Sequence, residues 1–396
     1  MADTPVVCVL GPRQVGKSTL VQQLDPGRHY VTFDDPSILE AAQEDPLGFV
    51  RALPEEVTLD EVQRVPELLP SIKLVVDENR APGRFILTGS ANLLLLPQVQ
   101  ESLAGRMEIV HLHPVSEMEK QGARHSLLRS LLKGELKSAV AGSGQVVEGV
   151  AEAICMGGYP EPNKRTRSAA KRWYGSYLKA IVQRDIKDLF QIQKEGELLR
   201  LIELLAYRTA SLVNVSKLSI DSGIDRETCV RYLAILERLF LARLLPAWHR
   251  NQAKRLIKTP KIHMVDSGLA AYLNNLSVAE WASHGTEFGG LLESFVVQQL
   301  ICQAGWVNPN LRFSHYRDKE KVEVDLVIEL GRSVWGVEVK RSATFRNRDG
   351  AGLARLASQA GKQFKGGMLL YSGTNCLPLQ TDGCFAVPLD HLWIDA

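Results

Sequence analysis

A phosphate-binding pattern lies close to the N-terminus. The pattern G-x-x-x-x-G-K-S/T is formed by Gly11, Pro12, Arg13, Gln14, Val15, Gly16, Lys17 and Ser18. It directly follows the apolar run Pro5–Leu10, and this strand-then-loop context argues against a chance match in a glycine-rich turn. The glycines let successive amides face a phosphate, while Lys17 can reach the β and γ phosphates. We therefore expect residues 11–19, Thr19 included, to bind ATP, with Arg13 as a further phosphate contact.

A pair of carboxylates follows a second apolar run. Val57–Leu59 leads directly into Asp60 and Glu61, which is typical of a Walker-B strand. We expect Ser18 and Asp60 to hold Mg²⁺, Asp60 through water, and Glu61 to polarise the attacking water as the general base. The alternative is that the two acids only begin a solvated helix.

Two further positions are candidates for sensing or stabilising the γ-phosphate. The run Arg84–Thr88 is followed by Gly89 and Ser90, so Ser90, or Thr88, is a candidate sensor at a strand end. Hydroxyl residues are also ordinary in turns at such places. Arg106 is a candidate arginine finger that acts on the ATP of a neighbouring subunit, and its alternative is a surface ion pair.

Short apolar runs alternate with helical stretches over residues 1–120, as expected of an α/β domain. The predicted strands are Pro5–Leu10, His29–Phe33, Val57–Leu59 and Arg84–Thr88, and the predicted helices begin near Lys17 and span about Pro66–Asn79. A strand lies in the sequence between the two motifs, and a glutamate stands beside the Walker-B aspartate. Both features favour the ATPase branch with an added central strand over a GTPase or a nucleotide kinase.

The middle of the chain carries the positive charge. Residues 162–261 hold 21 Lys and Arg against 9 Asp and Glu, a net charge of +12, whereas residues 1–120 hold 10 against 18, a net charge of −8. This asymmetry favours a polyanionic partner. Residues 196–265 also have the pattern of a winged helix. Its predicted elements are helices at Glu197–Tyr207, at Val215–Ser222 and from Asp225 to Phe240, followed by strands at Ala242–Trp248 and Lys261–Val265.

Basic residues of this winged helix are the candidate DNA contacts. They are Arg226, Arg231 and Arg238 on the third helix and Lys254, Arg255 and Lys258 on the wing. A winged helix lays its third helix in the major groove and its wing along the backbone, so binding should weaken steeply with added salt. The alternative is that the winged helix docks onto protein.

Acidic residues near the C-terminus follow the PD-(D/E)xK pattern. Glu293 lies in a predicted helix, Leu291–Ala304, Asp325 lies in a predicted strand, and Glu338-Val339-Lys340 lies on the next strand. Because side chains alternate along a strand, Glu338 and Lys340 share a face. Three carboxylates could then converge on Mg²⁺ or Mn²⁺, with Lys340 stabilising the hydroxide or the phosphorane. The alternatives are a cross-strand ion pair and a domain that binds DNA without cutting it.

Several short motifs resemble one widespread prokaryotic family. They are Thr88-Gly89-Ser90, Ser102–Arg106, Gly157–Glu161, Arg184-Asp185-Ile186 and Asp266–Leu269. Together with the P-loop they are similar to AAA-type (AAA+) ATPases that carry a C-terminal domain like the PD-(D/E)xK nucleases, and most members of this family are uncharacterised.

The resemblance implies an α/β chain of four parts. They are a P-loop AAA+ ATPase domain at 1–120, a helical linker or lid at 121–195 that includes an amphipathic helix at Lys171–Leu189, the winged helix at 196–265, and a restriction-endonuclease-like α/β domain at 266–396. We also expect a homo-oligomer, such as a ring or hexamer.

The composition is that of a globular protein, which we expect in the cytoplasm. No apolar run reaches the ~18 to 20 residues of a membrane helix, the N-terminus lacks signal-peptide features, and the six cysteines form no C-x-x-C pair. We therefore expect an ATP-hydrolysing protein that binds and remodels or translocates DNA, branched DNA above all. Two alternatives stay open: an ATP-dependent oligomeric switch or scaffold for protein partners, and a site-specific nuclease gated by ATP.

Overall fold

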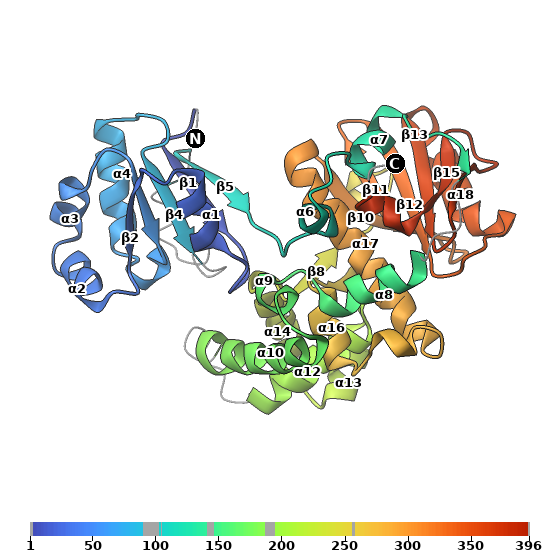
Figure 1. The fold of residues 1–396 in the computed structure, drawn as a ribbon, viewed down its shortest axis with the longest axis horizontal. Coiled ribbons are helices and arrows are strands. Elements are labelled where there is room, and N and C mark those ends of the chain that lie inside the picture. The colour runs from blue at the N-terminus through green and yellow to red at the C-terminus, as the bar shows by residue number, and fades with distance from the viewer. Residues whose placement is uncertain are drawn as a thin grey trace. The chain divides into compact units, whose positions relative to one another are not determined.

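The computed structural model describes residues 3–89, 103, 105–140, 146–186, 195–255 and 258–394. The chain divides into two compact units (Figure 1): Met1–Pro114 with Arg238–Leu241, and Val115–Glu237 with Ala242–Ala396. The ranges predicted as helical linker, winged helix and nuclease-like domain therefore all lie in the second unit, apart from residues 238–241. Among the helices of the described ranges, none is both long and apolar enough to span a bilayer.

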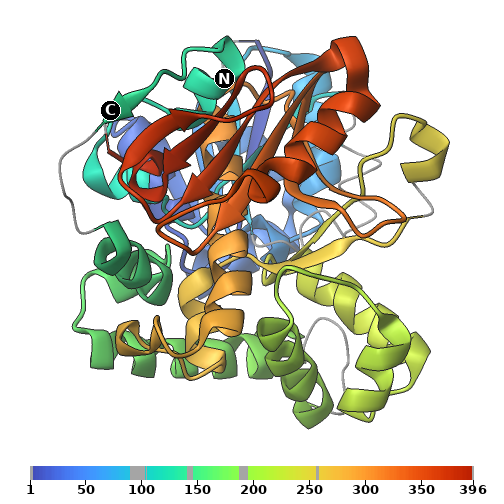
Figure 2. The same ribbon diagram turned by 90° about the vertical axis from the view of Figure 1, so that its right-hand side faces the viewer.

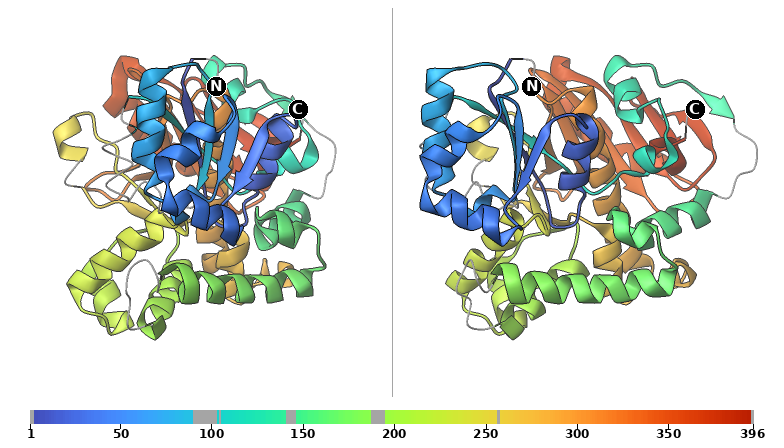
Figure 3. Two further views of the ribbon diagram at one scale, coloured as in Figure 1. Left: turned by 90° about the vertical axis from the view of Figure 1, so that its left-hand side faces the viewer. Right: turned by 60° about the vertical axis from the view of Figure 1, so that its left-hand side comes forward.

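The first unit is a parallel sheet with helices beside it (Figure 3). Its elements are β1 (Val6–Leu10), α1 (Lys17–Leu24), β2 (His29–Thr32), α2 (Pro36–Glu44), α3 (Pro46–Ala52), β3 (Val57–Asp60), α4 (Leu68–Glu78), β4 (Phe85–Gly89) and β5 (Met107–His111). All five residues of β1 and all five of β4 are buried, which is why both appear in the sequence as continuous apolar runs rather than alternating ones. Asp35 and Asp45 cap α2 and α3, each directly before a proline at the first helical position.

The order of the strands decides which residues meet. The sheet runs β2-β3-β4-β1-β5, so the strand between the P-loop strand and the Walker-B strand is β4, while the predicted strand at His29–Phe33 is β2, at the sheet edge. Leu10 pairs with Gly89, and Leu59 pairs with Leu87. Parallel strands in this register finish at one edge of the sheet, which gathers the P-loop, the Walker-B acids and the end of β4. The edge strand β5 was not predicted.

The second unit begins with helices. They are α6 (Glu117–Gln121), α7 (Leu127–Lys133), α8 (Val146–Met156), α9 (Pro160–Asn163), α10 (Arg167–Ala180) and α16 (Ser267–Leu273), with a short strand β6 (Ala139–Val140). The prediction of one helix at Lys171–Leu189 was wrong at its start, because the helix begins four residues earlier, at Arg167, after Thr166. It continues into a π-helical turn, Ile181–Ile186. Residues 187–194 lie outside the described ranges.

A buried junction joins these helices. The Asp266 carboxylate accepts hydrogen bonds from the Tyr174 hydroxyl (2.9 Å), the Leu269 amide (2.8 Å) and the Gly158 amide (2.7 Å). Gly157 has φ 67°, and a Cβ there would collide with the Tyr174 hydroxyl and lie 2.5 Å from Asp266 Oδ1. The motifs at Gly157–Glu161 and Asp266–Leu269 thus meet at one structural point.

A small three-stranded sheet with three helices follows. Its elements are α12 (Glu195–Tyr207), β7 (Ser211–Leu212), α13 (Val215–Ser222), α14 (Arg226–Arg238), β8 (Ala242–Leu245) and β9 (Lys261–Met264), with the one-turn helix α15 (Gln252–Arg255) between β8 and β9. The sheet order is β7-β9-β8. The prediction that the first wing strand extends to Trp248 was wrong, since β8 ends before Pro246, which has no amide hydrogen for the ladder.

The C-terminal part is a seven-stranded sheet (Figure 2), in the order β10-β11-β12-β13-β15-β14-β6. Its further elements are α17 (Gly285–Val307), β10 (Arg312–Arg317), β11 (Glu323–Leu330), β12 (Ser333–Lys340), α18 (Ala351–Ala360), β13 (Phe364–Tyr371), β14 (Asn375–Pro378) and β15 (Cys384–Pro388). β10, β11 and β12 are antiparallel neighbours, whereas β13 runs parallel to β12. The predicted acids therefore come from a helix and two adjacent strands.

Candidate functional site

The P-loop runs from the end of β1 to the start of α1. Gly16 has φ 101° and Gln14 has φ 58°, two left-handed conformations that turn the backbone sharply before the helix. At Gly16 the glycine meets a real steric need, since L side chains rarely adopt this φ. The helix that follows directs its N-terminal amides toward the loop, which is the arrangement that binds phosphate.

Lys17 lies at the centre of this loop. Its buried ammonium donates hydrogen bonds to the carbonyl oxygens of Gly11 (3.1 Å) and Pro12 (2.9 Å). Gln14 and Thr19 are exposed, Arg13 is half-buried, and Val15 packs inside. The loop therefore holds one cation where the sequence predicts the β and γ phosphates.

Asp60 is the focus of three hydroxyl groups. Ser18 Oγ donates to both carboxylate oxygens, at 3.0 and 3.1 Å, Tyr30 donates from its hydroxyl at 2.6 Å, and Thr88 Oγ1 donates to Oδ1. Burial, the hydrogen bond to Asp60 and the charge of Asp60 raise the pKa of Tyr30, so its hydroxyl keeps its proton. Three elements, α1, β2 and β4, thus fix the orientation of one carboxylate on β3.

Glu61 leaves the strand in an unusual conformation. Its φ is 60°, and its amide donates to Thr88 Oγ1 at 3.2 Å. The Gln63 side-chain amide donates to the Glu61 carboxylate. A non-glycine residue in the left-handed region carries strain that its surroundings must offset, and such strain is common at functional positions. Glu61 also begins a short 3-10 helix, Val62–Arg64, as its N-cap residue, so the structure keeps part of the helix-start alternative, while Gln63 holds the Glu61 carboxylate.

The other two candidates of this unit are placed differently. Thr88 joins β4 to the Walker-B strand, while Ser90 lies outside the described residues. Arg106 makes a bidentate ion pair with Asp77 on α4, with Nε to Oδ1 at 2.7 Å and Nη2 to Oδ2 at 2.9 Å. The hydrogen bond from Arg106 holds the pKa of Asp77 below its usual range. In this structure Arg106 therefore makes an ion pair, which was the alternative to an arginine finger.

The oxygen atoms at this edge suit a magnesium ion. Mg²⁺ usually takes one or two protein oxygens and fills its shell with waters and substrate phosphates. Ser18 and Asp60 offer such a set, and no group of three or more His, Cys, Asp or Glu side chains that could hold a metal occurs among the described residues. The residues present therefore fit Mg²⁺ that is bound together with a nucleotide.

The acids predicted near the C-terminus converge, and a lysine lies between them. Lys261, the first residue of β9, has its ammonium 2.8 Å from Glu293 Oε1, 3.3 Å from Asp325 Oδ1 and 3.4 Å from Glu323 Oε2. Asp325 Oδ2 accepts the Val339 amide at 2.9 Å. These groups, together with Glu338, form what we call the acidic centre.

The charges in the acidic centre act on one another. Burial lowers the pKa of Lys261, but the charges of Glu293 and Asp325 outweigh burial and raise it overall, so the ammonium form persists. Burial and then the charge of Asp325 raise the pKa of both Glu293 and Glu338 well above the usual range. Lys340, half-buried, acts on Glu338 through its charge. As arranged, these residues do not fit a divalent metal ion, because an ammonium lies among the carboxylates that would bind it.

The predicted DNA contacts fall into two groups. Arg226 and Arg231, with Arg238, are exposed on α14. Arg255 instead makes a bidentate pair with Glu329 on β11, at 2.6 and 2.8 Å. Lys258 donates to the Arg317 carbonyl at 3.2 Å, and the side chain of Lys254 lies outside what the structure describes. The two described wing cations therefore contact the C-terminal sheet.

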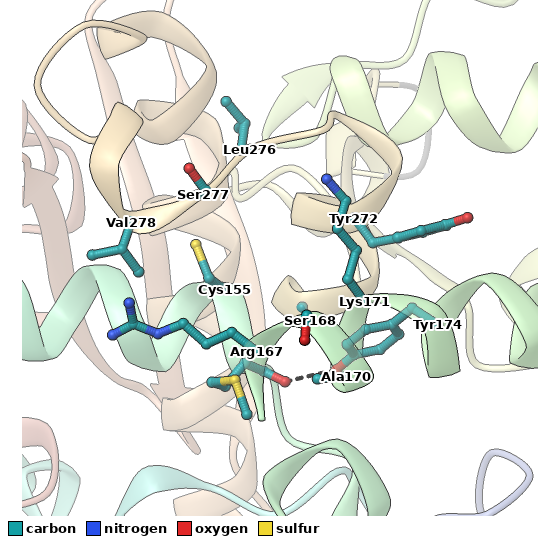
Figure 4. Close-up of a pocket in the computed structure, with 12 residues that line it drawn as sticks. Cys155, Arg167, Ser168, Ala170, Lys171, Tyr174, Tyr272, Leu276, Ser277 and Val278 are labelled. Atoms are coloured by element: carbon teal, nitrogen blue, oxygen red, sulfur yellow. Dashed lines mark hydrogen bonds between the residues drawn. The ribbon is translucent and has the colours of Figure 1, made fainter. Parts of the chain in front are cut away.

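A separate cavity of about 190 Å³ lies among α8, α10 and α16 (Figure 4). Cys155, Tyr174 and Tyr272 line it, together with two cations. Arg167 makes a bidentate pair with Glu152, at 3.0 and 2.6 Å, and Lys171 donates to Asn275 at 2.5 Å. Because both cations are paired within the chain, we assign no ligand to this cavity.

Three residues of these sites were not predicted from the sequence. Tyr30 was seen only as part of a strand, Lys261 only as the start of a wing strand, and Glu323 only as a neighbour of Asp325. A lysine at the head of a short apolar strand was the single available signal, since such a side chain needs an anionic partner when it is buried.

Family models match three stretches of the chain. Residues 3–120 match an AAA domain, residues 147–280 match a domain of unknown function (DUF8612), and residues 288–392 match another domain of unknown function (DUF4143). Two curated relatives are 29% identical over 396 residues, with 98% of this chain and 81% of the relative covered. They are the uncharacterized proteins Mb2031c of Mycobacterium bovis and Rv2008c of Mycobacterium tuberculosis.

Solved structures show only distant similarity. A RuvB variant from Thermotoga maritima is 19% identical, with 61% of this chain and 82% of that chain covered and a TM-score of 0.25. Cdc6p from Pyrobaculum aerophilum is 15% identical, with 70% and 88% covered and a TM-score of 0.22. TM-scores this low do not show a shared fold. The match of residues 3–120 to an AAA domain, however, agrees with the P-loop and the Walker-B acids that meet at one edge of the first sheet. The N-terminal part of this chain is an AAA-type ATPase domain.

Proposed function

We propose that this chain hydrolyses ATP and uses the turnover to remodel DNA or to move along it, with branched DNA as the substrate to test first. The observation that carries the ATPase part is the meeting of Ser18, Asp60 and Glu61 beside the P-loop, with Ser18 Oγ 3.0 Å from Asp60 Oδ1. A hydroxyl and two acids at the end of parallel strands are what phosphoryl transfer to water requires.

Each residue of this edge has a distinct proposed role. The loop amides and Lys17 hold the phosphates, and Ser18 with Asp60 holds Mg²⁺, which neutralises phosphate charge when it is bound. Glu61 orients a water molecule and takes its proton as that water attacks the γ-phosphorus, while the β–γ bridging oxygen leaves with ADP. Tyr30 keeps Asp60 in place.

The DNA part of the proposal rests on separate observations. The element order α12-β7-α13-α14-β8-β9 with sheet order β7-β9-β8 supports a winged helix. Arg226 and Arg231 are exposed near the start of α14, the third helix of this group, which is the helix that reads a DNA groove in such domains. The net charge of +12 over residues 162–261 adds a general attraction to phosphates.

The order α17-β10-β11-β12-α18-β13 also supports a nuclease-like architecture for residues 266–396. Glu293, Asp325 and Glu338 stand at the positions of the motif acids, and Lys340 shares a strand with Glu338. We propose that this domain contributes DNA binding, and that cutting would require a metal ion in the acidic centre.

One set of assays tests the proposed function. ATP turnover is measured without DNA and with single-stranded, duplex and four-way-junction DNA, for the native chain, Lys17→Ala and Glu61→Gln. We expect junction DNA to stimulate the native chain most, Lys17→Ala to lose nucleotide binding, and Glu61→Gln to bind ATP but turn over about 10² to 10⁴ times more slowly. Turnover that no DNA stimulates would remove the DNA part.

A second candidate is an ATP-dependent switch or scaffold for protein partners. The observation that favours it is the engagement of Arg255 and Lys258 with the C-terminal sheet, which leaves the proposed wing with fewer cations for phosphate. In that case ATP turnover is indifferent to DNA, and an ATP analogue changes the oligomeric state. Sedimentation of Glu61→Gln with and without ATP measures the change of oligomeric state, and the response of ATP turnover to DNA distinguishes the two candidates.

A further inference from the structure

The acidic centre contains a cation that belongs to the chain itself. Lys261 projects from β9, in the small three-stranded sheet, toward carboxylates on α17 and β11. Its side chain is 3% exposed, and those of its partners Glu293 and Asp325 are 14% and 13% exposed. A lysine is almost never buried to this extent unless it is paired, so its position depends on these acids.

The acids depend on Lys261 in return. Three carboxylate oxygens lie 2.8 to 3.4 Å from one nitrogen. Without a cation between them, the acids would repel one another in a poorly solvated place. The remaining oxygen of Asp325 is taken by the Val339 amide, so both of its oxygens have donors from the chain.

A divalent ion would have to compete with this ammonium for the same carboxylate oxygens. Mg²⁺ needs oxygen ligands at about 2.0 to 2.1 Å in a near-octahedral shell, and a positive charge among those ligands would oppose it. The one lysine that the PD-(D/E)xK pattern does predict, Lys340, lies on β12 with Glu338 and is a different residue. Lys261 is therefore an additional cation that the motif does not account for.

We propose that the ammonium of Lys261 is the resident cation of the acidic centre, and that it keeps this nuclease-like site from binding a divalent metal ion. The same ion pairs hold β9 against the C-terminal sheet and α17, so the centre fastens the two parts together instead of cutting DNA. This role needs neither ATP turnover nor DNA binding by the chain.

The experiment measures Mn²⁺ binding by electron paramagnetic resonance, without nucleotide, on the full chain carrying Asp60→Asn to remove the P-loop contribution. In this background we compare Lys261, Lys261→Met, Lys261→Arg, and Lys261→Met combined with Asp325→Asn. We expect Lys261→Met to bind Mn²⁺ at least about tenfold more tightly than the parent, and Asp325→Asn to abolish that gain. Lys261→Arg keeps the charge and should bind no better than the parent.

Thermal unfolding gives a second readout. Losing the ammonium should lower the melting temperature of Lys261→Met, and Mn²⁺ should raise it again by more than it raises the parent. If Lys261→Met does not fold, Mn²⁺ binding is compared between the parent and a variant of the parent that carries only Asp325→Asn in addition. Mn²⁺ binding by the parent that Asp325→Asn removes overturns the proposal, because Lys261 would then accompany a metal ion rather than replace it. A folded Lys261→Met that gains no Mn²⁺ site overturns it as well.

Discussion

At the scale of single residues, the ATPase site is organised around the orientation of Asp60. Hydroxyls from Ser18, Tyr30 and Thr88 all donate to its carboxylate. Ser18 and Thr88 belong to sequence motifs, whereas Tyr30 does not. Because a carboxylate that accepts several hydrogen bonds can rotate little, these donors set where Asp60 points before any ligand arrives.

Replacing Tyr30 by Phe tests this positioning role. The change removes one hydrogen bond of 2.6 Å to Asp60 and keeps the ring. We expect kcat for ATP hydrolysis to fall about tenfold, equivalent to about 1.4 kcal/mol, with the KM for ATP nearly unchanged. The matched control is Tyr207→Phe, since Tyr207 is 64% exposed in the other unit. An unchanged kcat, or a loss of ATP binding like that of Lys17→Ala, would contradict the assignment.

Whether a residue of either site could be predicted depended on whether a contiguous sequence motif contains it. Lys17, Ser18, Asp60 and Glu61 sit in contiguous motifs, so their meeting could be predicted once two parallel strands were recognised. Tyr30 reaches Asp60 only because β2 is the neighbour of β3 in the sheet, and no local pattern encodes that pairing. The contacts of Lys261 depend in the same way on how the chain folds back on itself.

At the scale of elements, the basic middle of the chain serves two different purposes. Arg226 and Arg231 are exposed on α14, whereas Arg255 is bound to Glu329 with both side chains largely shielded, 22% and 13% exposed. The sequence predicted one set of phosphate contacts from charge alone. Net charge does not show which cations already have partners within the chain. The sequence therefore could not separate the exposed cations of α14 from the paired cations of the wing.

Charge-removing changes should separate the two groups. Arg226→Gln with Arg231→Gln should weaken DNA binding and lower the slope of log affinity against log salt by about 2, because two phosphate contacts are lost. The melting temperature should not change. Fluorescence anisotropy with labelled duplex and junction DNA over a range of salt concentrations gives both values. An unaltered affinity would favour the scaffold alternative.

The opposite pattern is expected for the shielded pair. Arg255→Gln leaves Glu329 without its charged partner, so we expect a loss of about 1 to 3 kcal/mol in the free energy of unfolding and little change in the salt slope. Arg226→Gln alone serves as the matched exposed control. A fall in DNA affinity without a loss of stability would show that Arg255 leaves Glu329 to bind DNA.

The junction between α8, α10 and α16 gives a second prediction at this scale. Gly157→Ala should destabilise the second unit by about 2 kcal/mol or more, because the residue has φ 67° and a Cβ would collide with the Tyr174 hydroxyl. Gly149→Ala, within α8, meets no atom within 4 Å and should be neutral or stabilising by up to ~1 kcal/mol. Equal effects of the two changes in denaturant unfolding would refute this account.

Three of the strands that the sequence did not predict share physical features. β5 has four exposed residues, and the short strands β6 and β14 pair only at an edge of the large sheet. Such strands lack the apolar run or alternation that marks a buried strand, so only their hydrogen-bond partners reveal them. The strands β1, β3 and β4 carry strong apolar signals and were predicted to within one residue at their ends, whereas α17 was predicted only over Leu291–Ala304 and begins six residues earlier, at Gly285.

At the scale of the whole molecule, the two units can be followed separately. All six tryptophans lie in the second unit, so intrinsic tryptophan fluorescence reports its unfolding and not that of the ATPase unit. Nucleotide binding should stabilise only the first unit, in proportion to the logarithm of ATP concentration above its Kd. Any effect on the second unit must then arise through coupling between the two.

The stability of the second unit should fall in mild acid because of a buried histidine. His315 donates from Nε2 to the Thr259 carbonyl at 3.1 Å, and burial lowers its pKa from 6.5 to about 4. His315 in the unfolded chain therefore takes up a proton near pH 6.5, whereas in the folded unit it stays neutral until about pH 4. The stability that the neutral form contributes is complete above pH 6.5 and is lost as the pH falls toward 4. This amounts to about 3 kcal/mol for the one group.

Replacement by Gln isolates this effect, since Gln can keep the hydrogen bond to Thr259 but cannot take up a proton. Urea unfolding is followed by tryptophan fluorescence between pH 7.5 and pH 4, for the native chain, His315→Gln and the exposed control His284→Gln. The difference in unfolding free energy between the native chain and His315→Gln should shrink or reverse by about 3 kcal/mol over this range, while His284→Gln follows the native chain. A constant difference would mean that His315 takes up its proton in the folded unit as readily as in the unfolded one, and that the buried link between β10 and Thr259 does not exclude charge.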